Sequence, residues 1–96
     1  MYATLTTFPF KPGVREKLEK VADNQFSASQ GMKGLKSMTY FFNPEGNECG
    51  SFIIWDSKGD AEAAWAVIEP KIKETMSDMV TAPPTRSFYE VYKHKT

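Results

Sequence analysis

Few side chains in this sequence could do chemistry. The stretch FIIWDSKGDAEAAWAVIEP places two tryptophans, Trp55 and Trp65, across an expected strand end and an expected helix. A tryptophan can give a ligand site an apolar wall and one N–H donor, and it can equally fill a hydrophobic core. Both residues therefore have two interpretations, a ligand site or core packing.

Cys49 and His94 are the only cysteine and the only histidine. With one of each and no clustered carboxylates, the sequence has no metal-ligand spacing, and we predict no metal. Cys49 has no adjacent histidine or basic cluster, which favours a small buried hydrophobe over a reactive thiol. His94 lies close to the C-terminus, where a solvated tail is expected. No glycine-rich loop opens a helix, so we predict no nucleotide cofactor.

The elements that must position these residues can be read from the hydrophobic pattern. Four runs rich in β-branched and aromatic residues predict strands at 2–8, 35–42, 49–55 and 86–93. Apolar residues at spacings of three and four predict one helix from Val14 to about Gln30 and another beginning at Ser57. Proline lacks an amide donor, so Pro70 is expected to divide the second helix into two pieces.

The turn NPEGN at 43–47 favours a hairpin between the two middle strands. The resulting order, β-α-β-β-α-β, is the ferredoxin-like arrangement of the α+β class, with a four-stranded antiparallel sheet. A chain of 96 residues fits one domain, 1–96, with a single core.

Both faces of this sheet are expected to be apolar. The second strand carries Met38, Tyr40 and Phe42 on one face and Leu35 and Phe41 on the other. The third strand alternates in the same way, with large apolar side chains at every position of 52–55. Because the helices can cover only one face, the other needs a partner, and we expect a homodimer joined through the sheet faces.

The charge and the cysteine content limit the possible partners and the cellular compartment. Twelve basic and twelve acidic residues give a net charge of zero at pH 7, which favours neither nucleic acid nor a membrane surface. A single cysteine allows no disulfide within the chain, and the N-terminus lacks the pattern of a secretory signal. We therefore expect a cytoplasmic protein.

Several segments resemble the antibiotic-biosynthesis-monooxygenase-like domains, whose fold is the dimeric α+β barrel. They are FPFKPGVREKLEK after the first strand, IIWDSKGDAEAA before the second helix, and PPTRSFYEVYK at the end. The resemblance covers essentially the whole chain, and it places Trp55 at the strand-to-helix junction, where a large ring fills the barrel end. Its motifs are structural and do not by themselves select a reaction.

The resemblance implies a pocket between sheet and helices, with Trp65 as its wall and Thr6, Tyr40 and Tyr92 as possible polar contacts. Strand alternation alone does not settle which of them point inward. Family members that degrade haem use an asparagine where this chain has Thr6, and a ligating histidine near Thr75–Met76. Both residues are missing, so we predict no haem and no other cofactor.

Three functions remain open. The first is a cofactor-independent monooxygenase acting on a small aromatic, quinol-like substrate, for which the sequence supplies no general base. The second is a dimeric small-molecule binding protein of the same fold without turnover. The third is an RNA platform on the sheet, which the neutral charge and the missing basic residue before ECGSFIIW disfavour.

Overall fold

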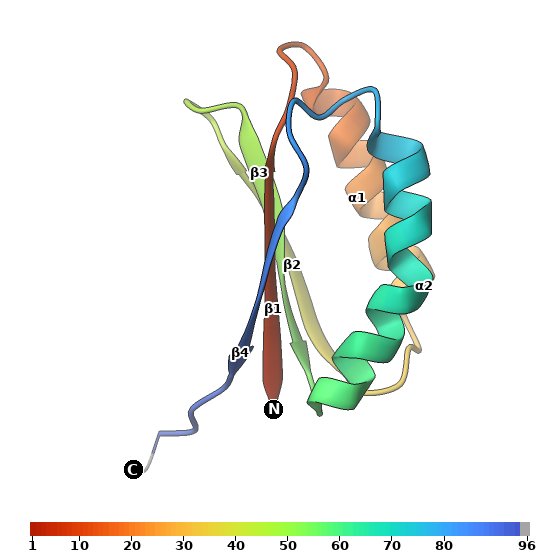
Figure 1. Cartoon of the computed structure of the whole chain (residues 1–96), viewed down its shortest axis with the longest axis vertical. Coiled ribbons are helices and arrows are strands. Elements are labelled where there is room, and N and C mark those ends of the chain that lie inside the picture. The colour runs from red at the N-terminus through yellow and green to blue at the C-terminus, as the bar shows by residue number, and fades with distance from the viewer. Residues whose placement is uncertain (95–96) are drawn as a thin grey trace.

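The computed structural model describes residues 1–94 and contains six elements in the expected order (Figure 1). The strands are β1 (Tyr2–Pro9), β2 (Leu35–Asn43), β3 (Glu48–Trp55) and β4 (Thr85–Glu90). The helices are α1 (Arg15–Ser29) and α2 (Lys58–Met76). The β-α-β-β-α-β prediction is confirmed.

The four strands form one antiparallel sheet in the order β2-β3-β1-β4. The hairpin between β2 and β3 turns through residues 44–47, where Asn47 adopts a positive φ of 46°, a conformation that asparagine tolerates better than most residues. β1 pairs with β3 on one side and β4 on the other, so it lies at the centre of the sheet.

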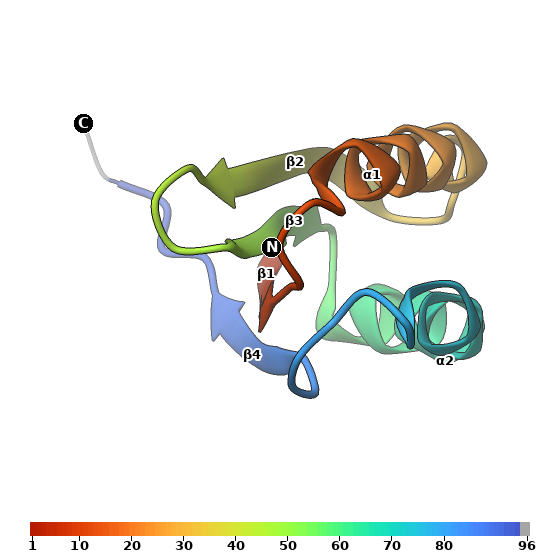
Figure 2. The same ribbon diagram turned by 90° about the horizontal axis from the view of Figure 1, so that it is seen from above.

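The molecule has two layers. Both helices cover the same face of the sheet, and the opposite face carries no element of the described chain (Figures 1 and 2). We call these the inner and outer faces. Neither helix in residues 1–94 has the length and apolar character needed to cross a bilayer.

Pro70 does not divide α2, and the prediction of two helical pieces was wrong. The helix runs unbroken from Lys58 to Met76, with Ser57 as its N-cap accepting a hydrogen bond from the Asp60 amide at 3.1 Å. Pro70 and Ala66, whose carbonyl loses its usual partner, are both exposed, so water can solvate that carbonyl. Ile68 and Met76 are buried on either side of the proline and hold both parts of the helix against the sheet.

β4 is shorter than the predicted strand 86–93, because its only neighbour is β1. Glu90 pairs with Tyr2, and the amide of Val91 donates to the carbonyl of Met1 at 3.0 Å. The described pairing of β4 with β1 ends there, and residues 91–94 lie outside the sheet.

Two clusters of buried side chains fill the ends of the space between sheet and helices. The proximal cluster, near the β1–α1 turn, has Phe10, Leu18, Cys49 and Met76 at its centre. The distal cluster, near the start of α2, has Trp55, Ala61, Ala64 and Ile68. These clusters define the core and leave a space between them.

The outer face is partly apolar, as expected. Phe41, Phe52 and Tyr89 lie on it with 37%, 40% and 51% of their surfaces exposed. Phe41 was predicted to share this face with Leu35, but a bulge between Leu35 and Ser37 shifts the alternation by one residue. Leu35 consequently packs on the inner face, against the distal cluster.

Candidate functional site

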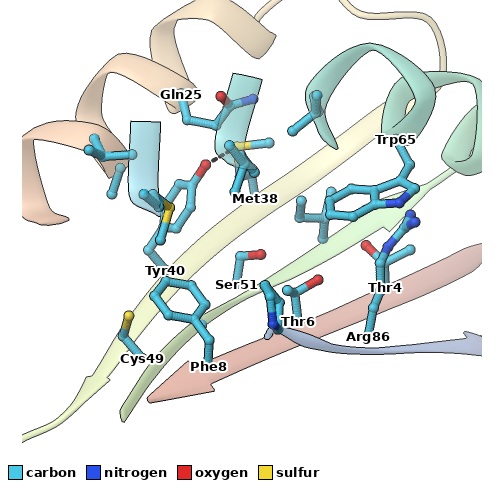
Figure 3. Close-up of a pocket in the computed structure, with 18 of the residues that line it drawn as sticks. Thr4, Thr6, Phe8, Gln25, Met38, Tyr40, Cys49, Ser51, Trp65 and Arg86 are labelled. Carbon is cyan, nitrogen blue, oxygen red and sulfur yellow. Dashed lines mark hydrogen bonds between the residues drawn. The ribbon is translucent and has the colours of Figure 1, made fainter. Parts of the chain in front are cut away.

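A partly enclosed cavity of about 80 Å³ lies between the two clusters, bounded by the sheet and both helices (Figure 3). All four strands contribute side chains to its floor, and α1 and α2 form its other walls. The lining is mostly apolar, with a few polar groups among it. This is the usual composition of a small-molecule site.

Four polar side chains on the floor form one row across the whole sheet. Arg86 of β4 pairs with Thr6 of β1, Thr6 pairs with Ser51 of β3, and Ser51 pairs with Tyr40 of β2. We call these four residues the polar row. Because strands lie about 4.8 Å apart, the row spans roughly 14 Å between its outer Cα atoms. Figure 3 shows Tyr40 and Arg86 at opposite sides of the pocket, with Ser51 and Thr6 between them.

The rows on either side are more apolar. Phe42, Cys49 and Phe8 form the row nearer the proximal cluster, and Met38, Ile53, Thr4 and Phe88 form the one nearer the distal cluster. A ligand lying over the polar row would therefore meet polar groups along one line of the floor and apolar side chains on both sides of that line. The floor is arranged for a flat molecule.

Among residues 1–94, Arg86 is the one charged side chain that lines the pocket. Its guanidinium lies 3.9 Å from the centre of the Trp65 ring and 4.4 Å from that of Phe88, both stacking distances. Burial lowers the pKa of Arg86, and the carboxylates Glu69 and Glu62 oppose that shift. No ion pair among residues 1–94 includes Arg86. The pocket thus holds a cation that stacks on aromatic rings and has no carboxylate of residues 1–94 within 4.0 Å, although Glu69 and Glu62 lie near enough to act on its charge.

Tyr40 lies at the other end of the polar row. Its hydroxyl donates to the thioether sulfur of Met38 at 3.3 Å, and burial raises the pKa of Tyr40 to about 12. The hydroxyl therefore stays protonated at neutral pH and is available as a donor. Gln25 of α1 lines the same part of the pocket and donates from Nε2 to the Ser29 hydroxyl at 3.1 Å.

The structure brings together three of the four residues that the sequence suggested for the pocket. Trp65, Thr6 and Tyr40 all line the cavity. Tyr92 does not, since it lies beyond the end of β4 with 67% of its surface exposed, beside His94. Its inclusion rested on the longer strand predicted at 86–93, and it has no place in this pocket.

The sequence reasoning missed Arg86 and Ser51. The arginine was visible as a charge two residues before Phe88 in a strand, but its role depends on the β1–β4 register, which places it beside Thr6. Ser51 likewise depends on pairing with Thr6 and Tyr40 together. Only the register of the sheet shows that these two residues belong to the pocket.

Trp55 and Cys49 border the cavity as parts of the core. Trp55 is 2% exposed, and its indole nitrogen is buried without a hydrogen-bond partner. Cys49 is buried, and that burial, with a smaller contribution from Glu48, raises the pKa of its thiol to about 11. A thiol with so high a pKa is a poor nucleophile at neutral pH. Within residues 1–94 there is no group of three or more His, Cys, Asp or Glu side chains suited to a metal ion.

Solved structures with the same fold include oxygenases. A monooxygenase of Streptomyces coelicolor from the gene ActVA-Orf6, determined with nanaomycin D, has a TM-score of 0.81 at 19% identity, covering 99% of this chain and 90% of that one. SnoaB, a cofactor-independent oxygenase from Streptomyces nogalater, has a TM-score of 0.78 at 12% identity, covering 97% and 94%. A Nitrosomonas europaea protein assigned provisionally as an antibiotic biosynthesis monooxygenase has a TM-score of 0.85 at 15% identity, covering 97% and 100%.

These similarities confirm, at the level of the fold, the resemblance to antibiotic-biosynthesis-monooxygenase-like domains. No protein-family model matches the chain, and no curated protein matches it in sequence. The fold is therefore that of a class containing cofactor-independent oxygenases, and the activity has to be argued from the pocket itself.

Proposed function

We propose that this protein is a cofactor-independent monooxygenase that acts on a small aromatic, quinol-like substrate. The observation that carries the proposal is Arg86, a cation with no ion-pair contact among residues 1–94, stacked on Trp65 in a mostly apolar pocket. In a pocket of low polarity a fixed positive charge stabilises an anion more strongly than it would in water. An electron-rich aromatic anion is the form that can pass electrons to dioxygen without a cofactor.

The overall reaction balances with the substrate as its own reductant. The substrate molecule loses two hydrogens in total, one ring carbon gains one oxygen atom of O₂, and the second oxygen atom leaves as water with those two hydrogens. The chain's part would be to orient the ring against Trp65, exclude water, and stabilise the deprotonated substrate oxygen through Arg86 and the neighbouring hydroxyl of Thr6, while Tyr40 at the far end of the polar row offers a second hydrogen bond to the substrate. No side chain in the pocket is assigned as a general base.

Oxygen uptake tests this function. A panel of reduced one- and two-ring phenols should include compounds that consume O₂ faster with protein than with heat-denatured protein. Labelled ¹⁸O₂ should place one atom in the product and one in water. Tyr92→Phe, which changes a side chain outside the pocket, is the matched control and should leave the rate unchanged.

Binding without uptake would contradict the enzyme proposal and favour the second function, a small-molecule binding protein of the same fold. The specific observation in its favour is that the pocket offers shape and charge but no identified base. Thermal-shift binding to the same panel, measured in parallel with uptake, separates the two.

We also propose that the protein is a homodimer joined through its outer faces. Phe41, Phe52 and Tyr89 leave an aromatic surface there that no element of the described chain covers. Light scattering at micromolar concentration should give twice the chain mass, and Phe52→Glu should reduce it to one chain. A monomeric parent that binds single-stranded RNA at low salt would instead favour the RNA platform.

The single cysteine fits a reducing compartment, and we propose the cytoplasm.

A further inference from the structure

The two ends of the polar row differ in charge. At the β4 end, Arg86 presents a permanent positive charge held by two aromatic rings. At the β2 end, Tyr40 presents an uncharged hydroxyl that keeps its proton, because its pKa is about 12. Thr6 and Ser51 lie between them. A flat ligand over this row would meet a different hydrogen-bonding group at each end.

The hydrogen bond at the neutral end can be exchanged for a better one. A thioether is a weak acceptor, and the Tyr40 hydroxyl has only the Met38 sulfur, at 3.3 Å. An oxygen acceptor brought into the pocket would form a stronger bond with the same hydroxyl. Met38 therefore holds the tyrosine donor in the pocket without competing strongly for it.

We propose that the pocket selects a ligand with two unlike oxygen ends: an anionic oxygen at Arg86 and an uncharged acceptor, such as a carbonyl oxygen, at Tyr40. This inference rests on the function proposed above for the same site, and it names the class of molecule the site takes. A neutral quinol would satisfy Tyr40 and leave Arg86 unpaired. An acid without a second acceptor would satisfy Arg86 alone.

The length of the row sets the length of the ligand, while the resting cavity of about 80 Å³ has to widen to admit it. The ends of the row are roughly 14 Å apart between Cα atoms, and both terminal side chains are long, so one or two aromatic rings must bridge the remaining distance. The apolar rows to either side, which include Phe42 and Ile53, would contact the ring faces or edges. The predicted class is an aromatic acid or phenolate with a carbonyl on the far side of the ring system.

Probes that cannot be oxidised test this arrangement by equilibrium binding alone. We use two sets of probes, one built on a single ring (4-acetylbenzoate) and one on two fused rings (6-acetyl-2-naphthoate). Each set contains the acetyl-substituted acid, its methyl ester, and the acid with isopropyl in place of acetyl. The ester removes the charge, and isopropyl removes the acceptor with little change in shape. Calorimetry or competition binding near neutral pH gives Kd for each.

The parent should bind the acetyl acid of at least one set more tightly than its ester by about ten- to hundredfold, the range for a hydrogen bond to a charged group. It should prefer acetyl over isopropyl by about two- to tenfold, the range for a neutral bond. Arg86→Met should abolish the first preference and keep the second, while Tyr40→Phe should do the reverse. Arg86→Lys should retain part of the preference for the acid.

Arg15→Met is the matched control, because Arg15 also lies over an aromatic ring, 4.7 Å from the centre of Phe42, but does not line the pocket. It should keep both preferences. Thermal melting of every variant shows whether a lost preference reflects unfolding. Two findings would overturn the proposal: equal binding of acid and ester by the parent at both ring sizes, or no binding of the acid at either. Preserved selectivity without oxygen uptake by any phenol would leave the two-ended pocket standing and reject the monooxygenase.

Discussion

The surroundings of the two tryptophans differ in what they leave unfilled. Around Trp55, in the distal cluster, Ala61 and Ala64 press small side chains against the ring, and only 2% of its surface is exposed. Trp65 lies in α2, half-buried, with one face on the guanidinium of Arg86 and a cavity beside it. The same residue type serves as filler at one site and as a wall at the other.

The comparison shows that the role of each tryptophan depends both on its burial and on the polar groups beside it. The indole N–H of Trp55 is buried without a partner, a cost that its packing offsets. Trp65 contacts the one cation of the pocket and has space beside it that a ligand can fill. We therefore expect substitutions of Trp55 to change mainly the stability and substitutions of Trp65 to change mainly ligand binding.

The largest effect is expected from Trp55→Ala. Truncating a fully buried tryptophan removes its apolar contacts and leaves a cavity, which typically costs about 3–5 kcal/mol. That is a large part of the stability of a small domain. Urea unfolding followed by circular dichroism should show this loss. A loss below about 1 kcal/mol would mean that the distal cluster does not depend on this ring.

The two phenylalanine substitutions are expected to have smaller effects, and each should change a different property. Trp65→Phe keeps an apolar ring but shortens the surface on which Arg86 stacks, so the affinity for the acetyl acid should fall severalfold while the melting temperature changes little. Trp55→Phe should lower the melting temperature and leave the affinity nearly unchanged. Thermal melting and calorimetry on both variants make the comparison. If Trp65→Phe binds as the parent does but is clearly destabilised, both tryptophans are core.

The last prediction concerns pH, and its two main contributors, Cys49 and Tyr40, lie on the side of the pocket away from Trp65. Burial raises the pKa of Cys49 from 9.0 to about 11 and that of Tyr40 from 10.0 to about 12. The unfolded chain loses these protons first, so both groups stabilise the fold fully below pH 9 and progressively less as the pH rises to about 12.

Urea unfolding at pH 8, 9.5 and 11 measures this decline. Cys49→Ala should flatten it at its lower end and Tyr40→Phe at its upper end, whatever each substitution does to stability at pH 8. Trp55→Phe, which removes no titratable group, is the control for the slope. An unchanged slope in both pocket variants would contradict the predicted protonation.

The sequence was sufficient for the order of elements, because alternation and helical spacing are local patterns. The site depended on facts that are not local. Arg86 and Ser51 become neighbours of Thr6 only through the β1 register, and the bulge before Ser37 moves Leu35 to the inner face. Tyr92 lies outside the pocket because β4 ends at Glu90 and does not reach residue 93. Trp65, Thr6 and Tyr40 could be suggested from the family resemblance, but their inward direction required the sheet.

The proline within α2 has a mechanical consequence for the pocket. Because Pro70 has no amide N–H, the carbonyl of Ala66, the residue next to Trp65, has no helical partner, so this turn has one backbone hydrogen bond fewer to resist bending. The parts of α2 on either side are anchored in different clusters, Ile68 in the distal one and Met76 in the proximal one. We expect the helix to yield at this point when a ligand larger than the resting cavity enters, so that Trp65 shifts outward while both ends of α2 keep their contacts with the sheet.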